Sequence, residues 1–185
     1  VGRNYAAHAH ELGNEVPDEM VVFLKPNSAI GEQLHAFSGE VLHYEAELVF
    51  MVNNGEFEAV AVGLDLTKRA LQSQLKAKAL PWERAKGFDG AALFSEFVAL
   101  PDDISLLSLS LAINGEQRQC GDVSQMLFPP ARILSDIKAF MSLEDGDLIM
   151  AGTPKGVGQV NAGDVFEACA YHQQQQLITR KWQAI

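Results

Sequence analysis

The sequence is poor in positive charge and in cysteine, and it lacks a long hydrophobic run. Its 185 residues carry 14 Lys and Arg against 24 Asp and Glu, a formal net charge of -10. This balance, with no basic run, argues against a nucleic-acid or membrane-surface partner. No apolar stretch approaches the roughly 18 residues of a membrane-spanning helix, and the first residues do not form a signal peptide.

The two cysteines, Cys120 and Cys169, are too few for a disulfide framework. We expect both to be reduced core thiols and the protein to be cytoplasmic. The length fits one domain with a substantial core, and the sequence has no internal repeat and no linker. A single domain over residues 1–185 is therefore predicted.

Two glutamates precede a hydrophobic segment near residue 50. If residues 43–52 form one strand, its period of two puts Glu45 and Glu47 on the same face. Carboxylates about 4 Å apart repel by roughly 4 kcal/mol at an effective dielectric of 20, so the pair needs water, a shared proton or a cation. The alternative is the solvated face of an edge strand.

A third carboxylate, Asp65, ends the apolar run at residues 59–65. The turn signal Asn53-Asn54-Gly55 predicts a hairpin that brings this run beside the first strand. Three carboxylates together favour a cation, and oxygen-only ligands suit Mg2+, Mn2+ or Ca2+. The alternative is that Asp65 only caps the following helix.

A His-Glu pair lies near the start of the chain. The pattern predicts a helix of one or two turns over Ala6–Leu12, ended by Gly13. His8 and Glu11, three residues apart, share a face of this helix. A glutamate that binds one ring nitrogen raises the basicity of the other, which prepares a histidine to activate water. The alternative is an ordinary surface pair.

The remaining pattern predicts short strands and two amphipathic helices. The strands are expected at 21–24, 107–113, 116–120, 148–151, 165–170 and 177–182, and the helices at 67–80 and 131–141. Gln72 follows Asp65 closely enough to reach the same cleft. Residues 82–89 are predicted to be a loop, in which Lys86 alone would be taken as solvated. The glycine-rich loop 152–158 offers backbone amides and the Thr153 hydroxyl to a carboxylate.

Taken together, these pieces resemble the fumarylacetoacetate hydrolase superfamily, and within it the small acylpyruvate hydrolases and oxaloacetate decarboxylases. The matching segments follow the family's order along almost the whole chain: 2–8, 23–26, 43–48, 64–67, 80–88, 114–119 and 146–158.

The resemblance implies a set of site residues and a metal. It implies Glu45, Glu47 and Asp65 as ligands of Mg2+ or Mn2+, with Ca2+ able to substitute; His8 and Glu11 as the His-Glu dyad; Lys86 as the active-site lysine; and Arg3, Gln72, Gly152 and Thr153 as substrate-binding positions.

The resemblance also implies a fold and an assembly. We expect an α+β, β-rich fold with a rolled mixed sheet and short flanking helices, one catalytic domain over residues 1–185, and a homodimer. Relatives carry residues before the Gly-Arg-Asn-Tyr motif, so we expect residues upstream of Val1. Ala70 stands where the family often has an acidic residue, and the turn at residues 172–176 lacks the usual glycine.

Three functions are compatible with these residues. The first is a metal-dependent hydrolase that cleaves a carbon-carbon bond in acylpyruvate-type 2,4-dioxo acids, with oxaloacetate decarboxylation on the same site. The second is an isomerase or tautomerase of 2-hydroxy-dienoates or oxaloacetate, which moves protons only. The third is a non-catalytic binding protein in which the metal ion only stabilises the fold. The first two require a small 2-oxo acid as substrate.

Overall fold

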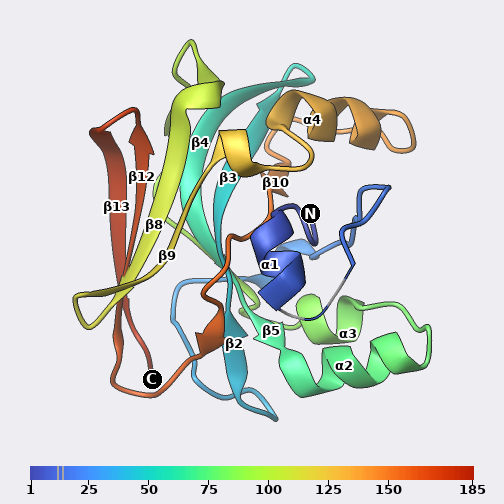
Figure 1. The fold of residues 1–185 in the computed structure, drawn as a ribbon, viewed down its shortest axis with the longest axis vertical. Helices are drawn as coiled ribbons and strands as arrows, with labels where there is room; N and C mark the ends of the chain where they lie inside the picture. The colour runs from blue at the N-terminus through green and yellow to red at the C-terminus, as the bar shows by residue number, and fades with distance from the viewer. Residues whose placement is uncertain (12, 14) are drawn as a thin grey trace.

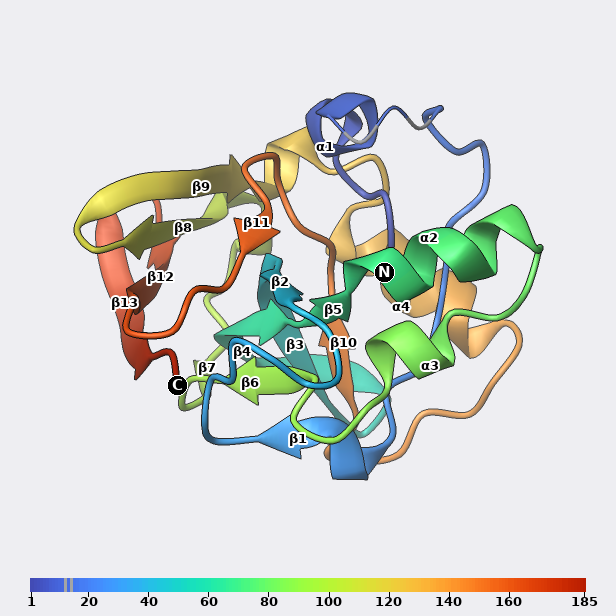
Figure 2. The ribbon, with the colours of Figure 1, turned by 90° about the horizontal axis from the view of Figure 1, so that it is seen from below.

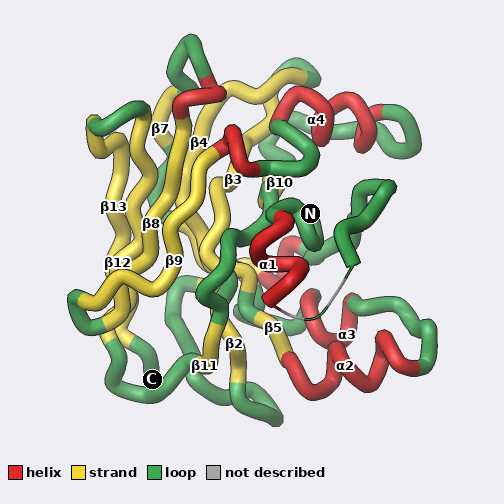
Figure 3. The backbone as a smooth tube through the Cα atoms, in the orientation of Figure 1, coloured by secondary structure: helices red, strands yellow, loops and turns green. Residues whose placement is uncertain are grey.

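The computed structural model describes residues 1–11, 13 and 15–185, and these fold around two large β-sheets (Figures 1 and 3). The larger sheet has the strand order β1-β6-β4-β3-β10, and β7 also pairs with β4. Because β1 and β6 run parallel while the other pairs are antiparallel, the sheet is mixed. Its strands are β1 Ile30–Gly31, β3 Ala46–Asn53, β4 Glu56–Asp65, β6 Ala92–Phe94, β7 Val98–Ala99 and β10 Leu148–Met150.

The second sheet is an antiparallel meander with the order β13-β12-β8-β9, and a small third sheet has the order β11-β2-β5. The meander contains β8 Leu107–Ile113, β9 Glu116–Asp122, β12 Val165–His172 and β13 Gln175–Gln183. The small sheet contains β2 Leu42–Tyr44, β5 Thr67–Lys68 and β11 Gly158–Gln159.

The hydrophobic core lies between the two large sheets. Alternate residues of β3, such as Leu48 and Phe50, are fully buried together with Leu109 and Leu111 of β8 and Phe166 of β12. Each such side chain contributes about 1.5–3 kcal/mol on burial. Since side chains alternate across a strand, the intervening residues of β3 face the opposite side of the sheet, where the polar residues gather.

The helices lie away from β12 and β13, on the other side of the molecule (Figures 1 and 2). They are α1 Ala6–Glu11, α2 Arg69–Ala77, α3 Glu83–Lys86 and α4 Pro130–Lys138, with 3-10 turns η1 Asn27–Ala29, η2 Ile104–Leu106 and η3 Val123–Gln125. Helix α2 buries Gln72 beside Leu75, so its inward face is partly polar. None of the described helices is long and apolar enough to cross a membrane.

The α+β, β-rich mixed-sheet fold with short helices is confirmed, and so is the β3–β4 hairpin. The prediction of one strand over residues 43–52 was wrong, because the chain leaves the small sheet after Tyr44 and enters the large sheet at Ala46. The loop predicted at 82–89 contains the helical turn α3, with Lys86 at its end. The predicted helix over Ala6–Leu12 is α1, and Leu12 lies outside the described residues.

Two further predictions were wrong. Residues 21–24 form only a single bridge, between Val21 and Gly2, and Leu24 is 56% exposed. This segment runs along the edge of the molecule into Pro26, which cannot donate a backbone hydrogen bond. Cys120 is exposed and not in the core, whereas Cys169 is buried as expected; both are free thiols. That residues 1–185 form one domain stays a prediction.

Candidate functional site

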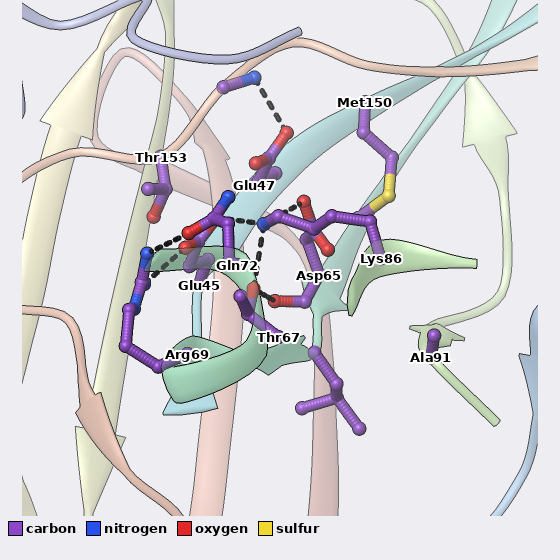
Figure 4. A network of polar contacts seen from close by, with 12 residues as sticks. Glu45, Glu47, Asp65, Thr67, Arg69, Gln72, Lys86, Ala91, Met150 and Thr153 are labelled. Carbon is purple, nitrogen blue, oxygen red and sulfur yellow. Dashed lines mark hydrogen bonds and ion pairs between the residues drawn. The ribbon is translucent and has the colours of Figure 1, made fainter. Parts of the chain in front are cut away.

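The strand register of the β3–β4 hairpin brings the three carboxylates together. Glu47 pairs with Gly63, and Asp65 lies two residues further along β4, so both side chains project from the same face. Glu45 stands at the break between β2 and β3, and its carbonyl accepts the backbone N–H of Asp65 at 2.8 Å. One ligand oxygen from each carboxylate lies within 4.8 Å of the others (Figure 4).

This triad fits a divalent cation. All three side chains are buried, with exposed fractions of 6% for Glu45 and 1% each for Glu47 and Asp65. Buried carboxylates require opposite charge, and a set of oxygen donors alone suits Mg2+, Mn2+ or Ca2+ better than zinc or copper. The sequence prediction of a three-carboxylate cluster is therefore confirmed as geometry, while the choice of ion stays open.

Lys86 lies at the centre of the network in Figure 4 and is not solvated. Its ammonium lies 2.8 Å from Glu45 Oε2, 2.8 Å from Asp65 Oδ2 and 2.6 Å from Thr67 Oγ1. Burial alone would lower the pKa of Lys86, but the carboxylates of Asp65 and Glu45 raise it above its ordinary value. The side chain therefore stays charged at neutral pH.

A second lysine, Lys25, whose side chain is 11% exposed, contacts the same network. Its Nζ lies 2.7 Å from Asp65 Oδ1 and donates to the carbonyl oxygens of Ala91, at 2.9 Å, and of Lys86. The contact with Asp65 is a close ion pair without hydrogen-bond geometry. Lys25 thus connects a metal-ligand candidate to the backbone at the last residue of α3 and in the loop that follows it. The sequence signal was weak, since a lysine before a proline usually lies in a loop.

Arg69, at the start of α2, is a site residue that sequence reasoning missed. Its Nη2 lies 2.5 Å from Glu45 Oε1, and its Nη1 donates to Gln72 Oε1 at 2.8 Å. Gln72 is buried and accepts a hydrogen bond from this arginine, while the expectation that it reaches the cleft beside Asp65 stays a prediction. The available signal was spacing, because Arg69 and Gln72 are three residues apart on one helix face.

The two glutamates have opposite protonation behaviour. Burial would raise the pKa of Glu45, but the charges of Lys86 and Arg69 lower it below its ordinary value. Burial raises the pKa of Glu47 to about 8, and the carboxylates of Asp65 and Glu45 add to this rise. Glu47 therefore has the weakest compensation by positive charge in the triad.

The glycine-rich loop, residues 152–158, contacts the site at Glu47. The backbone N–H of Gly152 donates to Glu47 Oε2 at 2.6 Å. Gly152 has φ +102°, and a Cβ there would lie 2.6 Å from Asn4 Cβ, so only glycine fits. The Thr153 hydroxyl donates to the Ala46 carbonyl and accepts from Gln119 Nε2, both at 2.8 Å. Both predicted substrate-binding positions therefore lie at the site, but their polar groups are already bound within the protein.

The predicted His-Glu dyad is present on α1. His8 Nδ1 lies 3.3 Å from Glu11 Oε2, and His8 is 4% exposed. The Glu11 carboxylate also accepts the N–H of Gly156 at 3.0 and 3.1 Å, which fastens α1 to the glycine-rich loop. Hydrogen bonds thus connect the dyad to this loop; among the described residues, none is recorded between His8 and the triad.

Arg3 lies next to the aromatic ring of Trp82, with its Cζ 5.8 Å from the ring centre. It has no recorded hydrogen bond to the triad among the described residues. A cavity of about 210 Å³ has Asp65 in its wall and is otherwise lined mainly by apolar residues such as Phe23 and Ile137. Because it reaches only one of the three carboxylates, it is not the space that the triad encloses.

This chain is similar to known proteins along nearly its whole length. The family model described as fumarylacetoacetate (FAA) hydrolase C-terminal matches residues 1–180. The mitochondrial oxaloacetate tautomerase FAHD1 of Arabidopsis thaliana is 40% identical, over 91% of this chain and 83% of that protein. The mitochondrial oxaloacetate decarboxylase of Dictyostelium discoideum is 36% identical, over 90% and 85%. A fumarylpyruvate hydrolase from Pseudomonas aeruginosa, solved with Mn2+ and pyruvate, has a TM-score of 0.86 at 30% identity, covering 100% of this chain and 87% of that one.

Proposed function

Because this chain belongs to the fumarylacetoacetate hydrolase family, we propose that it is a divalent-metal-dependent enzyme that interconverts the enol and keto forms of oxaloacetate. Relatives named oxaloacetate tautomerase at 35–41% identity support this choice of substrate. The observation that carries the proposal is the buried carboxylate triad, with the Lys86 ammonium beside it and a separate His-Glu dyad on α1.

Glu45, Glu47 and Asp65 would hold the ion, which supplies a Lewis acid that polarises the 2-oxo group of the substrate. Lys86 adds a fixed positive charge where negative charge develops during enolisation. Its three hydrogens are engaged by Glu45, Asp65 and Thr67, and its pKa is raised. Lys86 is therefore an electrostatic group and a poor proton carrier at neutral pH.

The His8-Glu11 dyad is the better proton carrier. When Nδ1–H of His8 is donated to Glu11, Nε2 is left free to accept a proton. In the ketonising direction the enol oxygen loses a proton and C3 gains one, so substrate and product have the same molecular formula. Glu11 is itself held by the Gly156 amide, which fixes the ring orientation through the carboxylate.

Carbon-carbon bond hydrolysis of an acylpyruvate is the second candidate, and the dyad favours it. A neutral, carboxylate-paired histidine also activates a water molecule for attack on a distal carbonyl. The similarity to fumarylpyruvate hydrolase supports this reaction, and the similarity to an oxaloacetate decarboxylase supports loss of carbon dioxide on the same site. The three reactions differ in their products and not in their metal ligands.

One experiment separates them. Purified protein is assayed with the enol form of oxaloacetate and with acetylpyruvate, each with Mg2+, with Mn2+ and with a chelator. Metal-dependent loss of the enol absorbance without release of carbon dioxide or pyruvate supports the tautomerase. Pyruvate from acetylpyruvate, or carbon dioxide from oxaloacetate, supports the alternatives. A metal-loaded protein that turns over none of these substrates would contradict the proposal and favour a metal-braced binding protein.

Several expectations stay predictions. They are the native metal, a homodimeric assembly, the absence of nucleic-acid or membrane partners, and a cytoplasmic location. Light scattering during size-exclusion chromatography tests the dimer. The location needs direct imaging, because the Arabidopsis and Dictyostelium relatives are named mitochondrial.

A further inference from the structure

We infer that Gln119, a buried residue of β9, makes the metal site selective for Mg2+ over Ca2+ by fixing the backbone between two of the candidate ligands. It acts through Ala46, the residue between Glu45 and Glu47. Gln119 is a positioning residue, because its recorded hydrogen bonds in the described structure go to neither carboxylate. The inference rests on the proposed function only for the triad as the place where the ion binds.

The backbone of Ala46 is held by side chains and not by a neighbouring strand on one edge of β3. The pairing of β10 with β3 ends at Val49, three residues after Ala46. The Ala46 N–H donates to Gln119 Oε1 at 2.9 Å, and the Ala46 carbonyl accepts the Thr153 hydroxyl at 2.8 Å. Both polar groups of this residue are thus bound from outside β3, by β9 and by the glycine-rich loop.

The amide of Gln119 is itself held in one orientation. Its Nε2 donates to Thr153 Oγ1 and to the carbonyl of Pro154, both at 2.8 Å. A rotated amide would set its N–H groups against the N–H of Ala46, so this assignment is determined by the neighbours. Gln119, Thr153 and Ala46 therefore form a closed ring of three hydrogen bonds. Because Gln119 is 1% exposed, removing its side chain would leave a buried N–H without its partner.

A β-bulge in β9 turns Gln119 toward this peptide. The register between β8 and β9 shifts by one residue and skips Arg118, directly before Gln119. Bulges re-aim the side chains of a strand and often lie next to functional sites. A Cβ at Gly156 would lie 2.0 Å from the Arg118 carbonyl oxygen, so the glycine-rich loop packs closely against the bulge. The second sheet thereby fixes both the loop and a peptide of the first sheet.

The position of Ala46 affects two candidate metal ligands at once. Glu45 and Glu47 flank it in sequence, and their carboxylates belong to the triad, so a shift of this backbone moves both. Mg2+ requires oxygen ligands at about 2.0–2.1 Å in near-ideal geometry, whereas Ca2+ accepts about 2.3–2.6 Å and a flexible arrangement. A firmly held Ala46 therefore favours the smaller ion, and a loosened one costs Mg2+ more than Ca2+.

The alternative is that Gln119 only satisfies a buried backbone N–H. Either role predicts a loss of stability when the side chain is removed. Only the positioning role changes the ratio of the affinities for the two ions, so this ratio is the measurement that separates them.

Four variants test the inference. Gln119→Met removes all three hydrogen bonds of the amide, and Thr153→Val removes the hydroxyl that holds the same peptide from the other side. Thr153→Ser keeps the hydroxyl. Gln117→Met, the same change at an exposed position of the same strand, is the matched control.

Binding of Mn2+, and its displacement by Mg2+ and by Ca2+, are followed through the EPR signal of the free Mn2+ ion. Circular dichroism checks that each variant is folded. Thr153→Val gives the answer if Gln119→Met does not fold, because both variants release the same peptide.

We expect Gln119→Met and Thr153→Val to weaken Mg2+ binding about 10- to 100-fold, and Ca2+ binding by less than about threefold. Thr153→Ser and Gln117→Met should keep the wild-type ratio. Equal weakening of both ions, or no weakening of either, would overturn the inference. A wild-type protein that binds neither ion would overturn it together with the metal assignment. The expected ratios in a protein that turns over no 2-oxo acid would refute the proposed enzyme and leave the role of Gln119 intact.

Discussion

Lys25 and Asp65 form a buried ion pair, with Nζ 2.7 Å from Oδ1, on the carboxylate whose other oxygen binds Lys86. Their side chains are 11% and 2% exposed. A candidate metal ligand is thus held by two lysines at once. Any cation that binds at Asp65 shares this carboxylate with Lys25.

Lys25→Met is therefore expected to destabilise the metal-free protein by about 3 kcal/mol, because it leaves part of a buried charge unpaired. Added Mn2+ should recover much of this loss, since the ion replaces the missing positive charge, so the metal-induced stabilisation should exceed that of wild type. Urea unfolding with and without Mn2+ measures both effects. Lys181→Met, which breaks the exposed pair with Glu167, is the control and should cost about 0–1 kcal/mol. Equal metal-induced stabilisation in wild type and Lys25→Met would refute the coupling.

Two conservative substitutions within the triad should behave differently. Glu47→Gln keeps an acceptor for the Gly152 N–H and imitates a protonated side chain, so its metal-free stability at pH 7 should be close to that of wild type. Glu45→Gln removes the charge that Lys86 and Arg69 both bind, and should cost about 3 kcal/mol. Thermal unfolding in chelator compares them.

Both variants should lose metal-dependent turnover, and Mn2+ affinity should fall by about 100-fold or more, since ligand loss should cost at least as much as loss of an outer-shell partner. Wild-type turnover by either one would remove the triad from the metal assignment.

Metal affinity should depend on pH through Glu47. With its pKa raised to about 8, this side chain holds a proton at neutral pH in the metal-free protein, and that proton must leave when an ion binds. Mn2+ affinity should therefore rise by up to about tenfold per pH unit and level off above about pH 8. Calorimetry in two buffers of different ionisation enthalpy at pH 6.5 should detect close to one released proton, and Glu47→Gln should release none.

The raised pKa of Glu47 also affects the stability of the metal-free protein, which should fall as pH rises whereas metal affinity should increase. Between the ordinary pKa of 4.5 and about 8, the folded protein binds more protons at Glu47 than the unfolded chain does. The contribution of Glu47 to metal-free stability therefore falls as pH rises through this range. Unfolding in chelator at a series of pH values should show a steeper fall for wild type than for Glu47→Gln.

The dyad can be tested without detaching α1. Glu11→Gln retains an amide oxygen that can accept the Gly156 N–H but removes the charge beside His8, whereas Glu11→Ala removes both. We expect Glu11→Gln to lower kcat about tenfold with little change in stability, and His8→Gln to lower it about 100-fold or more. Initial rates at saturating oxaloacetate measure this. Full activity of His8→Gln would assign the proton transfer to another group.

Local pattern predicted the parts of the site that lie on regular elements. Glu47 and Asp65 follow from two apolar runs and an Asn-Gly turn, and His8 with Glu11 follows from helical spacing. Other features depend on the tertiary fold. Local pattern predicts an exposed Lys86, but α3 buries its side chain. Local pattern likewise predicts only a loop at Lys25, and its ion pair with Asp65 is evident only from the fold.

Arg69 is a second case in which a site contact could not be predicted from local sequence. Its spacing to Gln72 is visible in the sequence, but its ion-pair partner, Glu45, lies 24 residues away at the break between β2 and β3. The break in the strand at Glu45 was also beyond local pattern, because it arises where the chain passes from one sheet to another. Periodicity predicts which face a side chain takes, and not which sheet a strand joins.

The hydrogen bond from Gly152 to Glu47 spans 105 residues of chain. At a synthesis rate of roughly 5–20 residues per second, the hairpin with all three carboxylates leaves the ribosome about 5–20 seconds before the loop that covers it. During that interval the carboxylates are exposed on an unfinished sheet edge, since β10 has not been made. A nascent chain that stops before residue 148 carries every candidate metal ligand but lacks both β10 and the Gly152 amide that binds Glu47.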